Sequence, residues 1–273
     1  MIDWYSTVAI KLHLLFNDTE LTHATCFFWR APDQLYLITN WHVVSGRDAV
    51  TARPLDSVTG AVPNAVCYQV SDVYGTRREV RVDLYDRGEA PFWLVHPEYG
   101  RAVDIAALPV TDFPRDSIVR AVNDLPEVPL VTRIGMPLFV LGFPFGSEMW
   151  PVWKQATIAS EPDLALRAGP NYMLVDTLSR PGMSGAPVIQ RIIGRGLVET
   201  TPVVVGDPTS PMRKEWQDIG IGRCSKFIGI YSGRLRTKSA IDAQLGLVWR
   251  RHLLEQVIHG VPDRHPTEHF RDS

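Results

Sequence analysis

The sequence has little cysteine and no long apolar run. Only three of its 273 residues are cysteines, they lie far apart, and no pair has the CxxC spacing of a zinc or redox site: Cys26, Cys67 and Cys224. An odd and scattered set excludes a disulfide framework and is typical of buried thiols in a reducing compartment. No stretch of about eighteen apolar residues is present, so the sequence predicts no membrane-spanning helix.

A strong excess of charge of either sign is also missing. The formal net charge is −2 and the pI is near 6.4, without a basic stripe. Nucleic-acid-binding proteins usually carry such a stripe, so we expect no nucleic-acid partner. The histidines show no metal-ligand spacing, and we expect no metal, no cofactor and no membrane partner.

The N-terminal segment lacks the pattern of a secretory signal. Such a signal begins with basic residues and continues into an unbroken apolar stretch. Here Asp3 comes first, and Lys11 and His13 interrupt the apolar residues. We therefore expect a cytoplasmic protein that needs no removal of an N-terminal peptide.

Long helical patterns are scarce, whereas chain breakers are abundant. The 21 prolines and 20 glycines favour many short segments joined by turns. One helix is predicted at 251–259, where apolar residues share one face and Gly260 is a suitable stop. Short strands separated by Pro, Gly and Asp indicate a sandwich or barrel. Apolar alternation predicts strands at 8–14, 25–29, 35–39, 66–73, 80–84, 92–95, 104–108, 138–141, 153–160, 172–177, 187–190, 227–231 and 246–249.

A polar, proline-containing stretch at 111–129 divides the strand pattern in two. We predict an N-terminal unit at 1–120, a C-terminal unit with its helix at 130–260, and a polar, frayed tail at 261–273. The stretch 201–223 is rich in proline, glycine and charge. We expect it to be a loop that gates a pocket or receives a partner.

Three segments carry residue types suited to acyl transfer. A serine hydroxyl is a poor nucleophile at neutral pH and needs an adjacent base, which histidine supplies. A carboxylate on the second ring nitrogen fixes the required tautomer. Taken alone, each residue also fits an ordinary role: a histidine at a strand end, an exposed acid, a serine in a Pro-Gly turn. The segments are ITNWHVV at 38–44 with His42, VDIAAL at 103–108 with Asp104, and RPGMSGAPV at 180–188 with Ser184.

In this order and with these flanks, the segments resemble the trypsin-like serine peptidases. Bacterial HtrA-like and glutamyl-endopeptidase-like sequences are the nearest, and GFPFG at 142–146 extends the likeness. The resemblance implies an all-β fold of two six-stranded antiparallel β-barrels with a short C-terminal helix. It places His42 and Asp104 in the first barrel and Ser184 in the second.

The resemblance also implies how the substrate is held. The backbone N–H groups of Gly182 and Ser184 would form the oxyanion hole. Trypsin has an aspartate where Leu178 stands, so a buried basic side chain would find no partner here. Glutamyl endopeptidases have a histidine at the position of Tyr231, so a preference for acidic residues is not supported either. The implied substrate-binding residues are Leu178, Ser179, Tyr231, Ser232, Gly233 and Arg234.

One departure from the family concerns activation. Digestive members have an aspartate before the nucleophile, which pairs with a newly cut N-terminus, but this chain has Met183. The sequence therefore predicts a serine endopeptidase that acts on protein or peptide substrates and is regulated by a protein partner or by narrow specificity. One version of this is a protease domain kept latent within an intracellular complex. The alternative is a catalytically silent, protease-like module that binds extended peptide.

Overall fold

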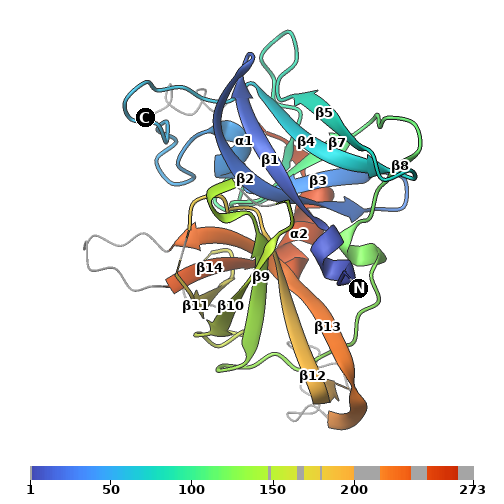
Figure 1. Cartoon of the computed structure of the whole chain (residues 1–273). Helices are drawn as coiled ribbons and strands as arrows, with labels where there is room; N and C mark the ends of the chain where they lie inside the picture. Colours follow the sequence, from blue (N-terminus) through green and yellow to red (C-terminus); the bar gives the residue numbers. More distant parts are fainter. Residues whose placement is uncertain are drawn as a thin grey trace.

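The computed structural model describes residues 2–146, 149–164, 169–178, 180–199, 216–234 and 245–263. Almost all of its regular structure is β, arranged as two bodies with one above the other (Figure 1). The expected all-β class with two sheet units and a short C-terminal helix is confirmed.

The first body is a nine-stranded antiparallel sheet in the order β15-β6-β7-β3-β2-β1-β4-β5, with β8 paired to β4. Six strands were expected here. The count is higher because three two-residue strands, β6, β8 and β15, are added to it. The 3-10 turn η1 (Trp4–Thr7) precedes the sheet, whose strands are β1 (Ala9–Phe16), β2 (Thr19–Arg30), β3 (Leu35–Thr39), β4 (Ala65–Asp72), β5 (Arg77–Asp83), β6 (Leu94–Val95), β7 (Ala106–Val110), β8 (Ser117–Ile118) and β15 (Val261–Pro262).

The second body is the expected closed barrel of six strands. The strand order around it is β10-β11-β14-β13-β12-β9, and every pair is antiparallel. Closure leaves no free sheet edge around the barrel. The strands are β9 (Pro137–Gly142), β10 (Val152–Ile158), β11 (Tyr172–Asp176), β12 (Pro187–Glu199), β13 (Trp216–Arg234) and β14 (Leu245–Arg250).

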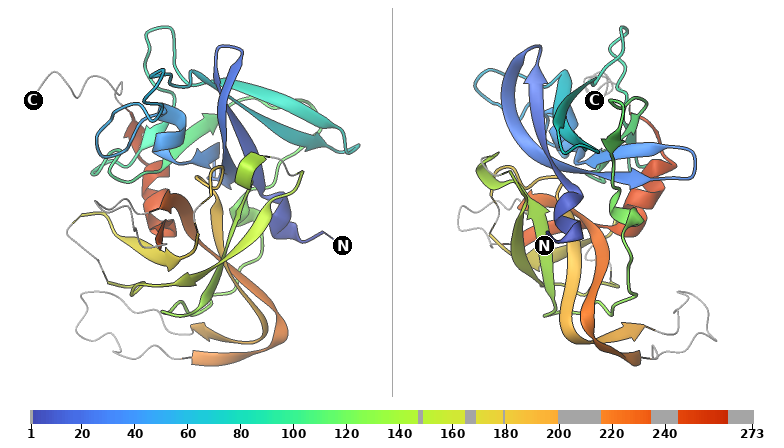
Figure 2. Two further views of the ribbon diagram at one scale, coloured as in Figure 1. Left: turned by 60° about the vertical axis from the view of Figure 1, so that its left-hand side comes forward. Right: turned by 45° about the vertical axis from the view of Figure 1, so that its right-hand side comes forward.

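Strands β12 and β13 are much longer than the sequence pattern predicted. They pair from Pro187 with Ile230 out to Glu199 with Trp216, and the hairpin projects from the barrel on the side away from the first body (Figures 1 and 2). The expected loop at 201–223 is therefore wrong for residues 216–223, which are strand. Interspersed glycines in both strands obscured the alternation of apolar residues. Residues 201–215 lie outside the described part of the chain.

The C-terminal helix α2 (Arg251–Ile258) begins and ends almost where the sequence predicted, and it lies between the two bodies (Figure 1). The backbone carbonyl of Val95 would lie 2.0 Å from a Cβ atom at position 260, so only glycine fits after this helix. The next residues were expected to fray. Instead Val261 and Pro262 form β15 and pair with β6 of the first body. Residues 264–273 lie outside the described part.

Three apolar cores hold this arrangement together. One lies within the first sheet and one within the barrel. The third joins the two bodies. It combines Phe27 and Trp29 of β2 with Phe227 and Trp249 of the barrel, and α2 adds Leu253. Because this third core draws on both bodies, their relative position is fixed by burial of large aromatic side chains.

Candidate active site

An aspartate and a histidine from the first body form a tight pair. Strand β3 leads directly into the short helix α1 (Trp41–Ser45), which carries His42, and Asp104 lies just before β7. One carboxylate oxygen of Asp104 lies 2.6 Å from His42 Nδ1, and the other accepts the backbone N–H of His42 at 2.9 Å. The carboxylate thus fixes both the ring and the backbone of the histidine, which leaves Nε2 as the nitrogen available for proton transfer.

Two further groups hold Asp104 in place. The buried Asn40 donates its side-chain amide to the Asp104 carbonyl at 2.7 Å, and the Ser232 hydroxyl donates to the Asp104 carboxylate. Burial would raise the pKa of this carboxyl. The neighbouring His42, with hydrogen bonds from His42 and Ser232, outweighs burial and lowers the pKa below its usual value. Asp104 is therefore ionised at neutral pH.

Ser184 lies in a tight turn that is anchored at both ends. Its carbonyl accepts from the backbone N–H of Thr25 at 2.9 Å, which connects the turn to β2 of the first body. The next backbone N–H, of Gly185, donates to the Tyr231 carbonyl at 2.9 Å. Gly185 has φ of +83°, and an added Cβ atom would lie 2.1 Å from the Thr25 carbonyl oxygen. Only glycine permits this turn to pack so closely against β2.

The residues before Ser184 form a second constrained turn. Gly182 has φ of +90°, and an added Cβ atom would lie 2.2 Å from the Phe143 carbonyl oxygen. The buried Thr25 hydroxyl donates to the Gly182 carbonyl at 2.7 Å and accepts the Phe143 N–H at 3.2 Å. Since the Gly182 carbonyl is held by Thr25, the orientation of this peptide is fixed from outside the turn.

His42, Asp104 and Ser184 line one cleft of about 1470 Å³, together with Ser232 and Gly233. The Ser184 hydroxyl lies 3.7 Å from where a Cβ atom of Gly233 would be. Within the described part of the chain, no hydrogen bond joins the His42 ring to the Ser184 hydroxyl. Such contacts are often loose in an unliganded site and tighten when substrate binds.

Only some of the residues expected to bind substrate line the cleft. Ser232 and Gly233 line the cleft, whereas Leu178 is half-exposed and does not line it. The side chain of Tyr231 is buried in the barrel core and does not line the cleft. Ser179 and the side chain of Arg234 lie outside the described part.

The structure adds residues to the site that sequence reasoning did not assign. Arg180, Pro181, Tyr172 and Trp249 line the cleft. Thr25 holds the turn before Ser184 from a distant strand, a role that no local motif signals. Asn40 stands two residues before His42 within the TNWH motif, so its position in the motif was the available signal.

The described residues contain no cluster of three or more His, Cys, Asp or Glu side chains that could hold a metal ion. No helix among them is long and apolar enough to cross a membrane.

Residues 24–195 match the family model of the trypsin-like peptidase domain. No curated protein sequence matches the chain. Among solved structures, a serine endoprotease from Yersinia pestis is 14% identical with a TM-score of 0.48, over 95% of this chain and 66% of its own. The HtrA-type protease AlgW with tripeptide is 15% identical with a TM-score of 0.46, over 93% of this chain and 60% of its own. A protease from M. tuberculosis in its active form is 18% identical with a TM-score of 0.45, over 96% and 85%.

The chain thus spans about two thirds or less of the first two of these proteins. The family match is of a different kind, because it covers more than half of the chain and includes all three residues of the predicted triad. The chain therefore belongs to the family of trypsin-like serine peptidases.

Proposed function

We propose that the protein hydrolyses peptide bonds with His42, Asp104 and Ser184 as its catalytic triad. The observation that carries the proposal is the double contact of Asp104 with the ring and the backbone of His42, in the same cleft as Ser184. An ordinary structural role does not require a histidine to be fixed at both points beside a serine in a glycine-rich turn.

The reaction follows from these positions. The Ser184 hydroxyl attacks the substrate carbonyl carbon while His42 Nε2 accepts its proton, and Asp104 stabilises the resulting imidazolium. The backbone N–H groups of Gly182 and Ser184 stabilise the negative oxygen of the tetrahedral intermediate. His42 then donates the proton to the leaving amine, and an acyl-enzyme remains on Ser184. Water, deprotonated by His42, releases the new carboxyl end and restores the serine.

A fluorophosphonate probe tests this assignment directly, because it reacts with activated serines. We expect stoichiometric labelling at Ser184 and cleavage of an unfolded protein substrate. In another triad enzyme, loss of the serine or the histidine costs about a millionfold in kcat, so Ser184→Ala and His42→Ala should abolish cleavage. Circular dichroism should show both variants folded. Activity of either variant close to wild type would exclude the triad.

The alternative function is a module that binds extended peptide without cutting it. The family match does not separate the two, because an inactive relative keeps the same fold. Absence of labelling at Ser184 under all conditions, combined with saturable binding of a peptide, would favour this alternative.

We further propose that cleavage follows uncharged apolar or small residues. Leu178 stands where trypsin carries an aspartate. A substrate lysine or arginine directed to that position would find no carboxylate there and would be desolvated without a partner at that point, although Asp48, Glu98 and Asp263 line other parts of the cleft. Digestion of a peptide library, with Ser184→Ala as the control, gives the profile. Arginine or lysine dominating the cleaved position would refute the preference.

Regulation by a protein partner and a cytoplasmic location are also proposals. Met183 carries no charge and cannot pair with a freed α-amino group, so activation by trimming is disfavoured. We propose that the stretch 201–223 contacts the partner. The protein expressed from Met1 should keep its mass while its activity changes with associated proteins. Activity that appears only after a cut near the N-terminus would contradict this.

A further inference from the structure

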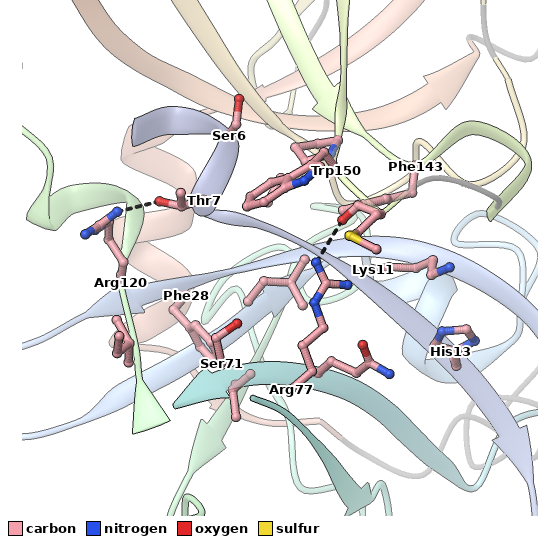
Figure 3. A pocket seen from close by; sticks show the side chains of 17 residues that line it. Ser6, Thr7, Lys11, His13, Phe28, Ser71, Arg77, Arg120, Phe143 and Trp150 are labelled. Atoms are coloured by element: carbon pink, nitrogen blue, oxygen red, sulfur yellow. Dashed lines mark hydrogen bonds between the residues drawn. The ribbon is translucent and has the colours of Figure 1, made fainter. Parts of the chain in front are cut away.

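A second cavity lies where the first body meets the connection from β9 to β10, with no described lining residue in common with the cleft that contains His42 and Ser184. Its volume is about 660 Å³, within the range of small-molecule sites. It forms where β1 and β4 diverge. Their pairing runs from Leu15 with Ala65 to Leu12 with Tyr68 and stops there, while β4 continues alongside β5 and β8. Figure 3 shows side chains from these strands converging on the opening.

The cavity is lined by cations from separate elements. Lys11 lies on β1, Arg77 on β5, and Arg120 after β8. His13 also lines it but pairs with Glu20 at 2.8 Å. Among the described residues that line the cavity there is no aspartate or glutamate. The site is therefore electropositive.

Both guanidinium groups are fixed by hydrogen bonds, and Arg120 also acts at longer range on Asp124, whose pKa it helps to lower. Arg77 Nη2 donates to the Met149 carbonyl at 3.4 Å, and Arg120 Nη1 donates to the Thr7 hydroxyl at 2.7 Å (Figure 3). Within the described part of the chain, no carboxylate lies at ion-pair distance from either one. A guanidinium has five N–H donors, so each arginine keeps donors for a carboxylate or phosphate.

The rest of the wall combines polar and apolar side chains. The polar ones are Ser6, Thr7, Gln69 and Ser71. The apolar part includes the buried Phe28 and Val70 together with Ile10, Ile118 and Trp150. An inorganic ion would leave this apolar surface in water, and a neutral apolar molecule would leave the cations unused. We propose that the cavity binds a small organic anion, with a carboxylate or phosphate on Arg77 and Arg120 and an apolar body against Phe28 and Trp150.

The cavity also shares a structural segment with the active site. Phe143, Met149 and Trp150 line it and belong to the connection from β9 to β10. From the same connection, Phe145 donates its backbone N–H to the Pro181 carbonyl at 3.2 Å, and the Phe143 carbonyl packs on Gly182. An anion on Arg77 competes with the Met149 carbonyl for the guanidinium. Binding therefore loosens the segment that supports the proposed oxyanion turn, and it lowers the reactivity of Ser184. This regulatory effect rests on the proposed function, whereas binding does not.

Calorimetry with four probes tests binding. 1-Naphthyl phosphate and 1-naphthylacetate carry an anion on an aromatic body, 2-(1-naphthyl)ethanol is the neutral analogue, and inorganic phosphate lacks the aromatic body. We expect saturable binding of the first two, and at least tenfold weaker binding of the others. Equal affinity for the neutral analogue, or no binding of the aromatic anions up to millimolar concentration, would overturn the proposal.

Three variants locate the site. Arg77→Gln and Arg120→Gln should each weaken 1-naphthyl phosphate at least tenfold. Arg81→Gln is the matched control, because it removes the same charge from the same strand but lies outside the cavity, where Arg81 pairs with Asp18. Equal weakening by Arg81→Gln would show a general charge effect and overturn the site. Thermal unfolding confirms that each variant is folded before its affinity is used.

The rate of Ser184 labelling tests the link between the sites. Saturating 1-naphthyl phosphate should slow fluorophosphonate labelling at least threefold in wild type and leave Arg77→Gln unaffected. Binding without a change in rate would refute the link. If Ser184 is never labelled, the proposed function fails on its own, while calorimetry still decides whether the cavity binds anions.

Discussion

The carboxylate of Asp263 joins the segment after β15 to the helix α1, which carries His42. Its Oδ2 accepts the indole N–H of Trp41 at 2.7 Å and that of Trp93 at 3.0 Å. Both indole rings are almost fully buried, and Trp41 is the residue directly before His42. Replacing Asp263 with alanine should therefore destabilise the fold and loosen α1.

The size of the effect follows from these two bonds. A hydrogen bond to a charged group contributes roughly 1.5–3 kcal/mol, and a buried donor left without an acceptor adds to the cost of its loss. Asp263 is partly exposed, so in the alanine variant water can take over part of the hydrogen bonding that its carboxylate provides. We expect Asp263→Ala to lower the free energy of unfolding by about 2–4 kcal/mol. For a chain of this length, that corresponds to a fall in Tm of roughly 4–8 °C.

Urea unfolding of wild type and Asp263→Ala, followed by tryptophan fluorescence, measures this loss. Asp263→Asn should lose about half as much, because its amide oxygen still accepts but carries no charge. Asp18→Ala is the control, since that side chain is fully exposed and should leave the midpoint unchanged. A loss below about 0.5 kcal/mol for Asp263→Ala would refute the claim that this carboxylate anchors the two indoles.

Three further predictions concern the site and the thiols. Asp104→Asn should lower kcat strongly, about 10⁴-fold in another triad enzyme. Because folding lowers the pKa of Asp104, its carboxylate stabilises the fold above the unfolded pKa near 3.9, and this contribution disappears as the pH falls through the folded pKa. In urea titrations, the free energy of unfolding should therefore fall less between pH 6 and pH 3 for Asp104→Asn than for wild type. Equal falls would contradict the pairing of Asp104 with His42. Gly182→Ala should slow Ser184 labelling at least about 100-fold because the turn must move away from Phe143, and wild-type labelling would show that the turn is not needed. Burial raises the pKa of the Cys26 thiol well above its usual value and that of Cys67 to about 12. Iodoacetamide at pH 8 should therefore modify both thiols only after unfolding, which peptide mass spectrometry can show. Rapid alkylation of the native protein would contradict their burial.

The local parts of the fold could be predicted from the sequence. The residues that form α2 can be predicted because four apolar residues on one face of a short segment, followed by glycine, admit few other structures. Strands such as β3 and β9 were placed for the same reason, since alternation over a few residues records which face is buried. The order of the three motifs around His42, Asp104 and Ser184 predicts the family, and the match over residues 24–195 shows it.

The parts that failed depend on contacts between distant residues. Asp263 lies 222 residues from Trp41 and 170 from Trp93, and nothing in the polar stretch after Gly260 indicates that it pairs with β6. Glycines hid the outer part of the β12–β13 hairpin, where pairing between the two strands compensates for weak β propensity. The burial of Tyr231 in the barrel core also depends on the packing of the barrel and cannot be seen from its position in the motif.

The geometry of the candidate site depends on contacts across the two bodies. Asp104 and His42 both come from the first sheet, but the Ser232 hydroxyl that binds the Asp104 carboxylate comes from β13 of the barrel. In the opposite direction, Thr25 of the first sheet holds the turn that precedes Ser184 of the barrel. Each body therefore supplies a hydrogen bond that orients the reactive group of the other. Since the shared aromatic core around Phe27 and Phe227 fixes how the bodies meet, substitutions in that core should reduce catalysis even where neither body unfolds.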